Sequence, residues 1–320
     1  MASQVPVKLM FWGLFALPVA AVCLLSIAGF WGRTWWLFDL ASHFRWQYAL
    51  FLLASALVFL FGKQPKAAGG AAAFALVNLA LIAPLYLRLQ PASQERPVYR
   101  LLFANVLQPN HSYGLLRDLI SQAEPDLIVL VEANRAWLEE LGSIRQDYPY
   151  WHSQTREDHY GVALISRIPI AEAETRAFGG AGVPSIIASF LLEGKPLTVI
   201  GTHPPPPKSA LKERYRNEQL TQLADFARTQ KGQLLLCGDL NLSPWSPYFR
   251  SLLHNSGLHD SARGFGLQLT WPVEQPFLRL PIDHCLVSPG IEIRARRVGP
   301  SIGSDHFPLI LDFSIDDEHH

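Results

Sequence analysis

Three long uncharged segments occupy most of the first 90 residues of this 320-residue chain. They cover residues 9–31, 46–61 and 67–87, which are 23, 16 and 21 residues without Asp, Glu, Lys or Arg. Crossing the hydrocarbon core of a bilayer takes about 20 apolar residues, so the second segment needs Phe44 or Gly62 to reach across. Aromatic residues, which prefer the headgroup region, lie near the segment ends: Trp12, Trp31, Trp35, Trp36, Trp46 and Tyr86. The sequence therefore predicts a membrane anchor of three transmembrane helices over residues 1–90.

A cleaved signal peptide is the alternative for the first segment. The segment is longer than the roughly 7 to 15 apolar residues of such a peptide, and two more apolar segments follow, so an anchor is favoured. Asp39, His43 and Arg45 fall in the short connection between the first two segments. We expect them to be solvated loop residues, with a contact to lipid headgroups as the alternative.

The flanking charges determine the orientation only weakly. With the N-terminus inside, Lys8, Lys63 and Lys66 are cytoplasmic, whereas five arginines are outside: Arg33, Arg45, Arg88, Arg96 and Arg100. The positive-inside rule mildly opposes this orientation. Arg96 and Arg100 lie beyond the start of the predicted linker, however, and without them each side of the membrane has three basic residues.

Net charge differs between the two parts of the chain. Residues 1–90 contain six basic and one acidic side chain, a net +5, and the totals of 27 and 27 leave 21 basic and 26 acidic side chains, a net −5, for the remainder. Duplex-binding proteins rely on basic side chains that neutralise phosphates, so this balance argues against a DNA-coating surface. Cys23, Cys237 and Cys285 have apolar surroundings and form no CxxC pair, which predicts buried small side chains rather than a disulfide framework or a zinc site.

After a predicted linker at residues 91–97, short apolar runs alternate with amphipathic ones over residues 98–320, which indicates one α/β domain with mixed sheets. Helices are predicted at 113–123, 134–141 and 210–229, with Asn134 as an N-cap. Strands are predicted at 98–107, 126–132, 161–166, 185–192, 196–203, 233–239, 282–288 and 308–313.

Side chains that can bind metal or phosphate lie at one end of most of the predicted core strands. In chain order these are Asn105, Glu132, His203 after Thr202, Asp239 with Asn241, Asp283, and Asp305 with His306. One carboxylate at a strand end is ordinary, because Asp favours turns. Six such positions in one domain instead indicate a site built by convergence.

This ordered set resembles the endonuclease/exonuclease/phosphatase superfamily, which has the DNase I-like fold. The most specific matches are Gly-Asp-Leu-Asn at 238–241 and Gly-Ser-Asp-His at 303–306. His284 departs from the pattern, since many relatives have an aromatic residue there. The resemblance spans about residues 98–313 and implies two mixed sheets in a sandwich flanked by helices, with the site at one end.

The resemblance also implies the roles of these residues in phosphoester hydrolysis. Glu132, Asp305 and the amide oxygen of Asn105 would bind Mg²⁺, with Mn²⁺ as the alternative, because hard cations prefer oxygen ligands. His306 would accept a proton from water, with Asp283 orienting its ring, although Asp239 is the other candidate for the base. Asp239 and Asn241 would orient the nucleophile and the phosphoryl oxygens, and His203 would donate to the same group.

Other polar residues have a plainer interpretation. Four basic residues, Lys208, Lys212, Arg214 and Arg216, lie near the start of the long predicted helix. We expect a solvated helix face there, with steering of a phosphate substrate as the alternative. Five histidines lack a motif and are not assigned to the site: His111, His152, His159, His254 and His259.

An anchor joined to a phosphoesterase domain predicts a multi-pass protein of the plasma membrane that acts on a lipid-linked phosphoester or pyrophosphate. The arrangement resembles the bacterial teicoplanin-resistance membrane proteins, which implies a catalytic domain on the outer face. A membrane-bound nuclease is the alternative, which the negative domain charge disfavours. A catalytically inactive binding module is disfavoured by the complete residue set, and the sequence indicates no protein partner.

Overall fold

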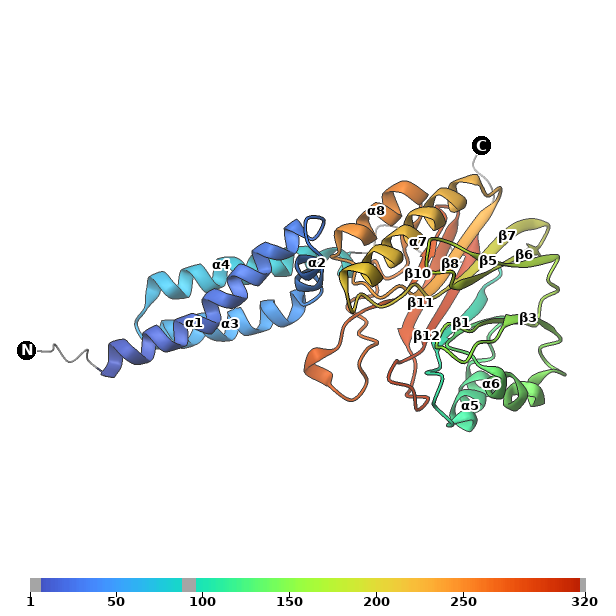
Figure 1. The fold of residues 1–320 in the computed structure, drawn as a ribbon, viewed down its shortest axis with the longest axis horizontal. Coiled ribbons are helices and arrows are strands. Elements are labelled where there is room, and N and C mark those ends of the chain that lie inside the picture. The colour runs from blue at the N-terminus through green and yellow to red at the C-terminus, as the bar shows by residue number, and fades with distance from the viewer. Residues whose placement is uncertain (1–6, 88–95, 317–320) are drawn as a thin grey trace, which may run out of the picture. The chain divides into compact units, whose positions relative to one another are not determined.

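The computed structural model describes residues 7–87 and 96–316 and contains two compact units. One unit is Met1–Pro84 with Trp245–Pro247, and the other is Leu85–Pro244 with Tyr248–His320. Of the predicted linker at 91–97, residues 91–95 lie outside the described residues. Figure 1 shows the elements of both units.

The first unit is helical. Its helices are α1 (Val7–Ala28), α2 (Trp36–Ser42), α3 (Arg45–Phe61) and α4 (Pro65–Ile82). Phe11–Trp31 and Pro65–Tyr86 are long and apolar enough to cross a membrane, and α2 with α3 forms a pair bent by 64° that makes a third span if it counts as one. The helical unit thus has two or three segments that could be transmembrane.

The helical unit buries a network of polar side chains beside its apolar core and exposes many other apolar side chains. Arg45 Nη1 donates to the Ser26 carbonyl (2.7 Å) and to Asn78 Oδ1 (3.3 Å), and Asn78 Nδ2 donates to Ser26 Oγ (2.8 Å), so α1, α3 and α4 share one buried network. Leu14 and Leu17 on α1 are exposed. The expectation of solvated residues at 39, 43 and 45 was wrong: all three are buried, because α2 fills the predicted connection and Arg45 begins α3.

The second unit contains two six-stranded sheets (Figure 1), with strand orders β11-β12-β1-β2-β4-β3 and β5-β6-β7-β8-β10-β9. The strands are β1 (Tyr99–Asn105), β2 (Leu127–Val131), β3 (Tyr150–Gln154), β4 (Val162–Ser166), β5 (Glu172–Ala177), β6 (Pro184–Leu192), β7 (Lys195–Thr202), β8 (Gln233–Asp239), β9 (His259–Asp260), β10 (Asp283–Val287), β11 (Ile291–Val298) and β12 (Leu309–Ile315). The predicted DNase I-like sandwich of two mixed sheets is confirmed.

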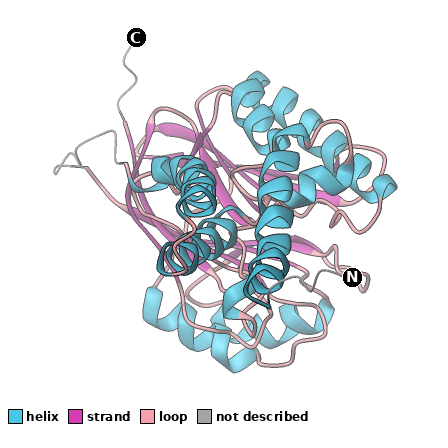
Figure 2. Ribbon diagram, turned by 90° about the vertical axis from the view of Figure 1, so that its left-hand side faces the viewer, coloured by secondary structure: helices cyan, strands magenta, loops and turns pink. Residues whose placement is uncertain are grey.

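Apolar side chains from both sheets form the central core, in which Phe103 and Val129 pack with Ile186 and Val199. Helices α5 (Tyr113–Ala123) and α6 (Arg135–Glu140) pack on the first sheet, whereas α7 (Ala210–Thr229) and α8 (Pro247–Ser256) pack on the second. In Figure 1 and Figure 2 these two pairs of helices lie on opposite sides of the strands, with α5 and α6 below and α7 and α8 above. Asn134 caps α6 as predicted, because its side chain accepts a hydrogen bond from the Trp137 backbone N–H.

Strand direction brings the polar strand ends together. β1 and β2 are parallel, with Asn105 opposite Val131, and β7 and β8 are parallel, with Thr202 opposite Gly238. β10 is antiparallel to β8, so Asp283 at its start lies opposite Asp239 at the end of β8. β12 is antiparallel to β1, so Asp305 and His306 just before it lie at the same end. The carboxyl ends of four strands and the amino ends of two others therefore supply the candidate site.

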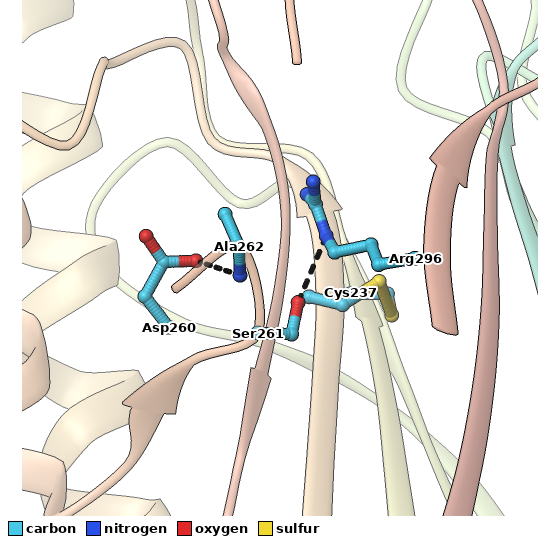
Figure 3. The surroundings of a disulfide bond; sticks show 6 residues. Cys237, Asp260, Ser261, Ala262 and Arg296 are labelled. Carbon is cyan, nitrogen blue, oxygen red and sulfur yellow. Dashed lines mark hydrogen bonds between the residues drawn. A yellow bond between two sulfur atoms is a disulfide. The ribbon is translucent and has the colours of Figure 1, made fainter. Parts of the chain in front are cut away.

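Cys237 and Cys285 form a disulfide between β8 and β10, where the two residues are directly paired. Figure 3 shows Cys237 near Asp260 of β9, Ser261, Ala262 and Arg296, and Arg296 belongs to β11 of the first sheet. The prediction of unpaired buried cysteines was wrong for these two, whereas Cys23 is free. The strand register alone brings together cysteines that are 48 residues apart in sequence.

Candidate active site

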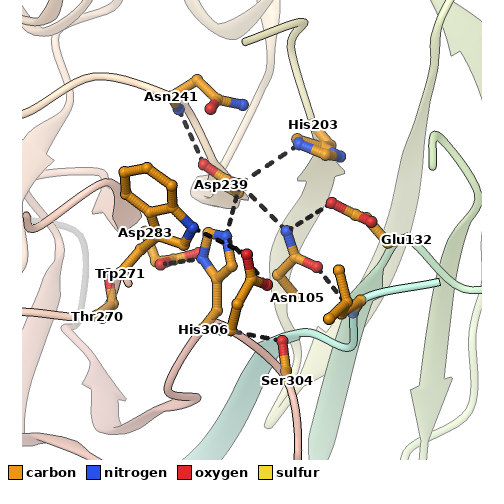
Figure 4. A network of polar contacts seen from close by, with 12 residues as sticks. Asn105, Glu132, His203, Asp239, Asn241, Thr270, Trp271, Asp283, Ser304 and His306 are labelled. Atoms are coloured by element: carbon orange, nitrogen blue, oxygen red, sulfur yellow. Dashed lines mark hydrogen bonds and ion pairs between the residues drawn. The ribbon is translucent and has the colours of Figure 1, made fainter. Parts of the chain in front are cut away.

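A buried histidine–aspartate pair lies at the centre of the candidate site (Figure 4). His306 Nδ1 and Asp283 Oδ2 are 2.8 Å apart, and both side chains are buried. The opposite ring nitrogen of His306, Nε2, lies 3.5 Å from Asp239 Oδ2 and 4.0 Å from Asp305 Oδ1. Burial alone would lower the pKa of His306, but the charges of Asp283 and Asp239 outweigh it and raise the pKa to about 10. The imidazolium form is therefore favoured in the protein without a metal ion.

Asp239 connects the histidine pair to the other sheet. Its Oδ2 accepts a hydrogen bond from Asn105 Nδ2 (3.2 Å) and lies 3.4 Å from His203 Nε2, and its Oδ1 accepts from the Asn241 backbone N–H (3.0 Å). Burial raises the pKa of Asp239, but the charge of His306 and the His203 contact lower it more, to about 2. Asp239 is thus a carboxylate at neutral pH.

The turn after β8 is fixed by Asn241 and Arg216. Asn241 has a φ of 53°, a left-handed conformation that Asn tolerates better than most residues, and its Nδ2 donates to the Pro204 carbonyl (3.0 Å). Arg216 Nη1 donates to the Asn241 carbonyl (3.1 Å), and the Arg216 side chain is buried. The expectation of a solvated face was therefore wrong for Arg216, which positions this turn instead.

Glu132 follows β2 with a φ of 59°. Its Oε1 accepts from Asn105 Nδ2 (3.1 Å), and its Oε2 accepts from the Gln108 backbone N–H (3.3 Å) and lies 2.8 Å from His159 Nδ1. Because Asn105 Nδ2 bonds both Glu132 and Asp239, these two carboxylates border the same space. His159 was not assigned to the site from sequence, and only its place just before a predicted strand could have indicated it.

His203 sits against the segment that carries His159. Its Nδ1 lies 3.2 Å from the His159 carbonyl oxygen, and its ring centroid is 5.6 Å from that of Tyr160. Burial would lower the pKa of His203, yet the contact and charge of Asp239 raise it above its ordinary value. His203 can therefore act as a hydrogen-bond donor toward a phosphoryl group.

Asp305 lies on the other side of His306. Trp271 Nε1 donates to Asp305 Oδ2 (2.9 Å), and the Trp271 ring centroid is 6.2 Å from that of His306. Trp271 has no motif around it and was not predicted from sequence as a site residue. The contacts described for the Asp305 side chain join it to Trp271 and His306, and none of them joins it to Glu132 or Asn105.

The donor set fits a hard divalent cation. Glu132 and Asp239 supply carboxylate oxygens around one amide, and ligand atoms of Asp239, Asp283 and His306 lie within 4.8 Å of one another. Asp283 and His306 are already paired with each other, which leaves Glu132, Asp239 and Asn105 as the group more available to a cation. Asn105 would bind a cation through Oδ1, which accepts from the Leu107 backbone N–H (3.0 Å) in this structure.

Residues 99–306 match the model of the endonuclease/exonuclease/phosphatase family. Phospholipase C of Staphylococcus aureus is 27% identical over 197 residues, which cover 50% of this chain and 60% of the relative. Sphingomyelinase C of Listeria ivanovii is 26% identical over 208 residues, covering 53% and 62%. The chain thus spans about three fifths of the length of these relatives.

Solved structures show the same fold. Humanized D. rerio TDP2 has a TM-score of 0.58 at 17% identity, covering 68% of this chain and 99% of that one. The endonuclease/exonuclease/phosphatase protein of Beutenbergia cavernae has a TM-score of 0.54 at 19% identity, covering 69% and 72%. With the family model matched across the sandwich and the polar strand ends converging inside it, this chain belongs to the endonuclease/exonuclease/phosphatase family of phosphoesterases.

Proposed function

We propose that the protein is a membrane-anchored, divalent-metal-dependent phosphoesterase that hydrolyses a phosphoester or pyrophosphate of a lipid-linked substrate. One observation carries the chemical part of this proposal: the buried His306–Asp283 pair and the carboxylates of Asp239 and Glu132 converge at one end of the sandwich. Hydrolysis needs a proton acceptor and groups that compensate charge on the phosphoryl oxygens, and this cluster offers both.

The reaction forms a bond from the water oxygen to phosphorus and breaks the bond from phosphorus to the leaving oxygen. Asp283 holds the His306 ring through Nδ1, which leaves Nε2 facing Asp239 as the atom that takes or gives the proton. His203 and Asn241 border Asp239, where they would donate hydrogen bonds to the phosphoryl oxygens of a bound substrate. As an imidazolium, His306 donates a proton. The surrounding negative charge raises the pKa of His306, so His306 becomes a base once that charge is reduced.

We assign the metal to Glu132 and Asn105, and Asp239 lies beside them. Asp305, which lies near His306, would be a further ligand. A bound Mg²⁺ or Mn²⁺ would neutralise charge on the phosphoryl and leaving oxygens. The carboxylates are held in place without it by the Asn105 amide and the Gln108 backbone N–H.

Membrane anchoring is supported by the arrangement of the helical unit. Its polar residues Ser26, Arg45 and Asn78 bond to one another in the interior, whereas leucines of α1 point outward. A helix bundle in lipid has this distribution, because lipid solvates apolar side chains and polar groups must find partners inside. Three crossings would place the N-terminus and residues 98–320 on opposite faces.

A catalytic domain on the outer face is supported by the disulfide between Cys237 and Cys285, since disulfides persist in oxidising compartments and are rare in the cytosol. A lipid substrate is supported by the anchor and by the two sequence relatives named phospholipase C and sphingomyelinase C. The net −5 after residue 90 makes DNA the less favoured substrate.

The test is a substrate screen of the purified full-length protein in detergent. Lipid monophosphates, lipid diphosphates, phosphodiester lipids and DNA would be compared with magnesium, with manganese and with a chelator. The proposal predicts metal-dependent release of phosphate or of a phosphorylated headgroup from at least one lipid. Hydrolysis of DNA alone would assign the protein to the nucleases.

A further inference from the structure

An exposed apolar tip lies on the loop between Thr270 and Leu280. Phe277 is 77% exposed, which is the largest value among the large apolar side chains described in the catalytic unit, and its neighbour Leu278 is 51% exposed. Both lie in the short 3-10 helix Pro276–Leu278. Adjacent large apolar side chains at a loop tip have no packing role in the sandwich, and such exposure marks a binding surface.

The loop is held firmly at its base. The backbone N–H groups of Thr270 and Trp271 donate to the Leu280 carbonyl (both 3.1 Å), and Leu280 N–H donates back to Trp271. Arg279 donates to the carbonyls of Pro272 and Val273. The tip is therefore carried on a hairpin-like support with its own hydrogen bonds.

The same base is bonded to the catalytic segment. Val273 N–H donates to the Asp305 carbonyl and Phe307 N–H donates to the Thr270 carbonyl (both 2.9 Å), while Trp271 Nε1 donates to the Asp305 side chain. These bonds enclose His306 on both sides, and Figure 4 shows Thr270 and Trp271 beside Asp283 and His306. The base of the loop that carries the tip is thus fixed next to the reacting groups.

We propose that Phe277 and Leu278 insert into the lipid surface and seat the active site on the bilayer. This inference rests on the proposed function for its substrate. The chain between Leu87 at the end of the last apolar segment and Val98 at the start of the catalytic domain has eleven residue steps, so it reaches about 40 Å at most and keeps the domain near any bilayer the helices cross. An aromatic and an aliphatic side chain side by side are the groups expected to partition into the headgroup and acyl boundary.

A contact experiment tests the surface directly. Phe277→Cys in a Cys23→Ala background would carry a fluorophore in the full-length protein, reconstituted with brominated phospholipids. We expect strong quenching by the bromine atoms. The control is Leu191→Cys, because Leu191 is 61% exposed. Leu191 pairs with Pro196 at one end of β6, whereas the other end of β6 pairs with Thr202, next to the candidate site. A label at 277 no more quenched than the label at 191 would overturn the proposal, including the case in which a second copy or another protein covers the tip.

A kinetic experiment tests the role of the contact. Phe277→Ser combined with Leu278→Ser should lower hydrolysis of a bilayer lipid by about tenfold or more, while hydrolysis of water-soluble bis(p-nitrophenyl) phosphate changes by less than about twofold. Leu191→Ser should alter neither rate. Equal losses on both substrates would show a structural role and overturn the proposal.

The two readouts separate this surface from the proposed function. If the label at 277 is quenched but the wild-type protein hydrolyses no lipid, the lipid-binding surface stands and the substrate assignment fails. If lipid is hydrolysed and the label is not quenched, the surface alone fails.

Discussion

Asp239 and Asp283 lie opposite each other on the antiparallel strands β8 and β10, and the two ring nitrogens of His306 face one each, Nε2 at 3.5 Å and Nδ1 at 2.8 Å. The disulfide joins the same strands two residues away, at Cys237 and Cys285. One strand pairing thus sets the spacing of both carboxylates around the histidine.

Replacing Glu132 with Gln should reduce hydrolysis by about a hundredfold or more, because a carboxylate at the proposed metal and phosphate site is lost without a change in side-chain volume. Asp225→Asn, an exposed change on α7, is the matched control and should retain the wild-type rate. Steady-state rates and circular dichroism of both variants check the prediction. A well-folded Glu132→Gln protein with wild-type activity would show that the metal binds elsewhere.

Asp283→Asn should slow hydrolysis by weakening the orientation and the charge of His306. Combined with His306→Ala, it should cost little more than His306→Ala alone, because residues that act as a unit are not additive. A double-mutant cycle on kcat/KM measures the coupling. Losses that multiply fully would mean that the two residues act separately.

The pKa of His306 is raised from 6.5 to about 10 by Asp283 and Asp239 against the effect of burial, so protonation of His306 favours the folded state of the metal-free protein. This stabilisation is complete below pH 6.5 and is lost as the pH rises toward 10. The midpoint of thermal unfolding of the wild type should therefore approach that of His306→Ala over this range. A difference between the two proteins that stays constant from pH 6 to 10 would contradict the ion pair.

Magnesium should lower the pKa of His306, because a cation near Asp239 and Glu132 offsets the negative charge that stabilises the imidazolium. Nuclear magnetic resonance of ¹⁵N-labelled histidine in the full-length protein, with a chelator and with magnesium, measures the shift. An unchanged pKa in saturating magnesium would place the cation away from His306.

If the catalytic domain is exposed to an oxidising compartment, one of the three cysteines, Cys23, should react with a maleimide polymer in the denatured protein, and all three should react after reduction. Gel shifts of protein taken directly from cells count the adducts. Three adducts without reductant would argue for the cytoplasmic face.

The central strands were predictable from sequence because burial on both sides makes them continuously apolar, as in Leu127–Val131. The four missed strands, β3, β5, β9 and β11, are the four edges of the two sheets. Edge strands keep polar side chains, and β5 is mostly exposed, so periodicity gives no clear signal there. Helix α8, also missed, is short and begins at a proline.

The polar strand ends were predictable because a strong family pattern marks them. Figure 4 shows seven of the predicted residues in one region: Asn105, Glu132, His203, Asp239, Asn241, Asp283 and His306. Asp305 Oδ1 lies 4.0 Å from His306 Nε2. His159, Trp271 and Arg216 were not, because each contributes through a tertiary contact: with Glu132, with Asp305 and with the Asn241 carbonyl. The Cys237–Cys285 bond likewise depends on strand register, which sequence spacing does not reveal.

The most direct test of the account is hydrolysis by the full-length protein reconstituted in lipid vesicles, with Asp239→Asn as the inactive control and a DNA oligonucleotide as the competing substrate. We expect wild-type protein with magnesium to cleave a phosphorylated bilayer lipid, a chelator to stop the reaction, and Asp239→Asn to lower the rate by about a hundredfold or more. Cleavage of the oligonucleotide without cleavage of any lipid, or an unchanged rate in well-folded Asp239→Asn, would contradict this expectation.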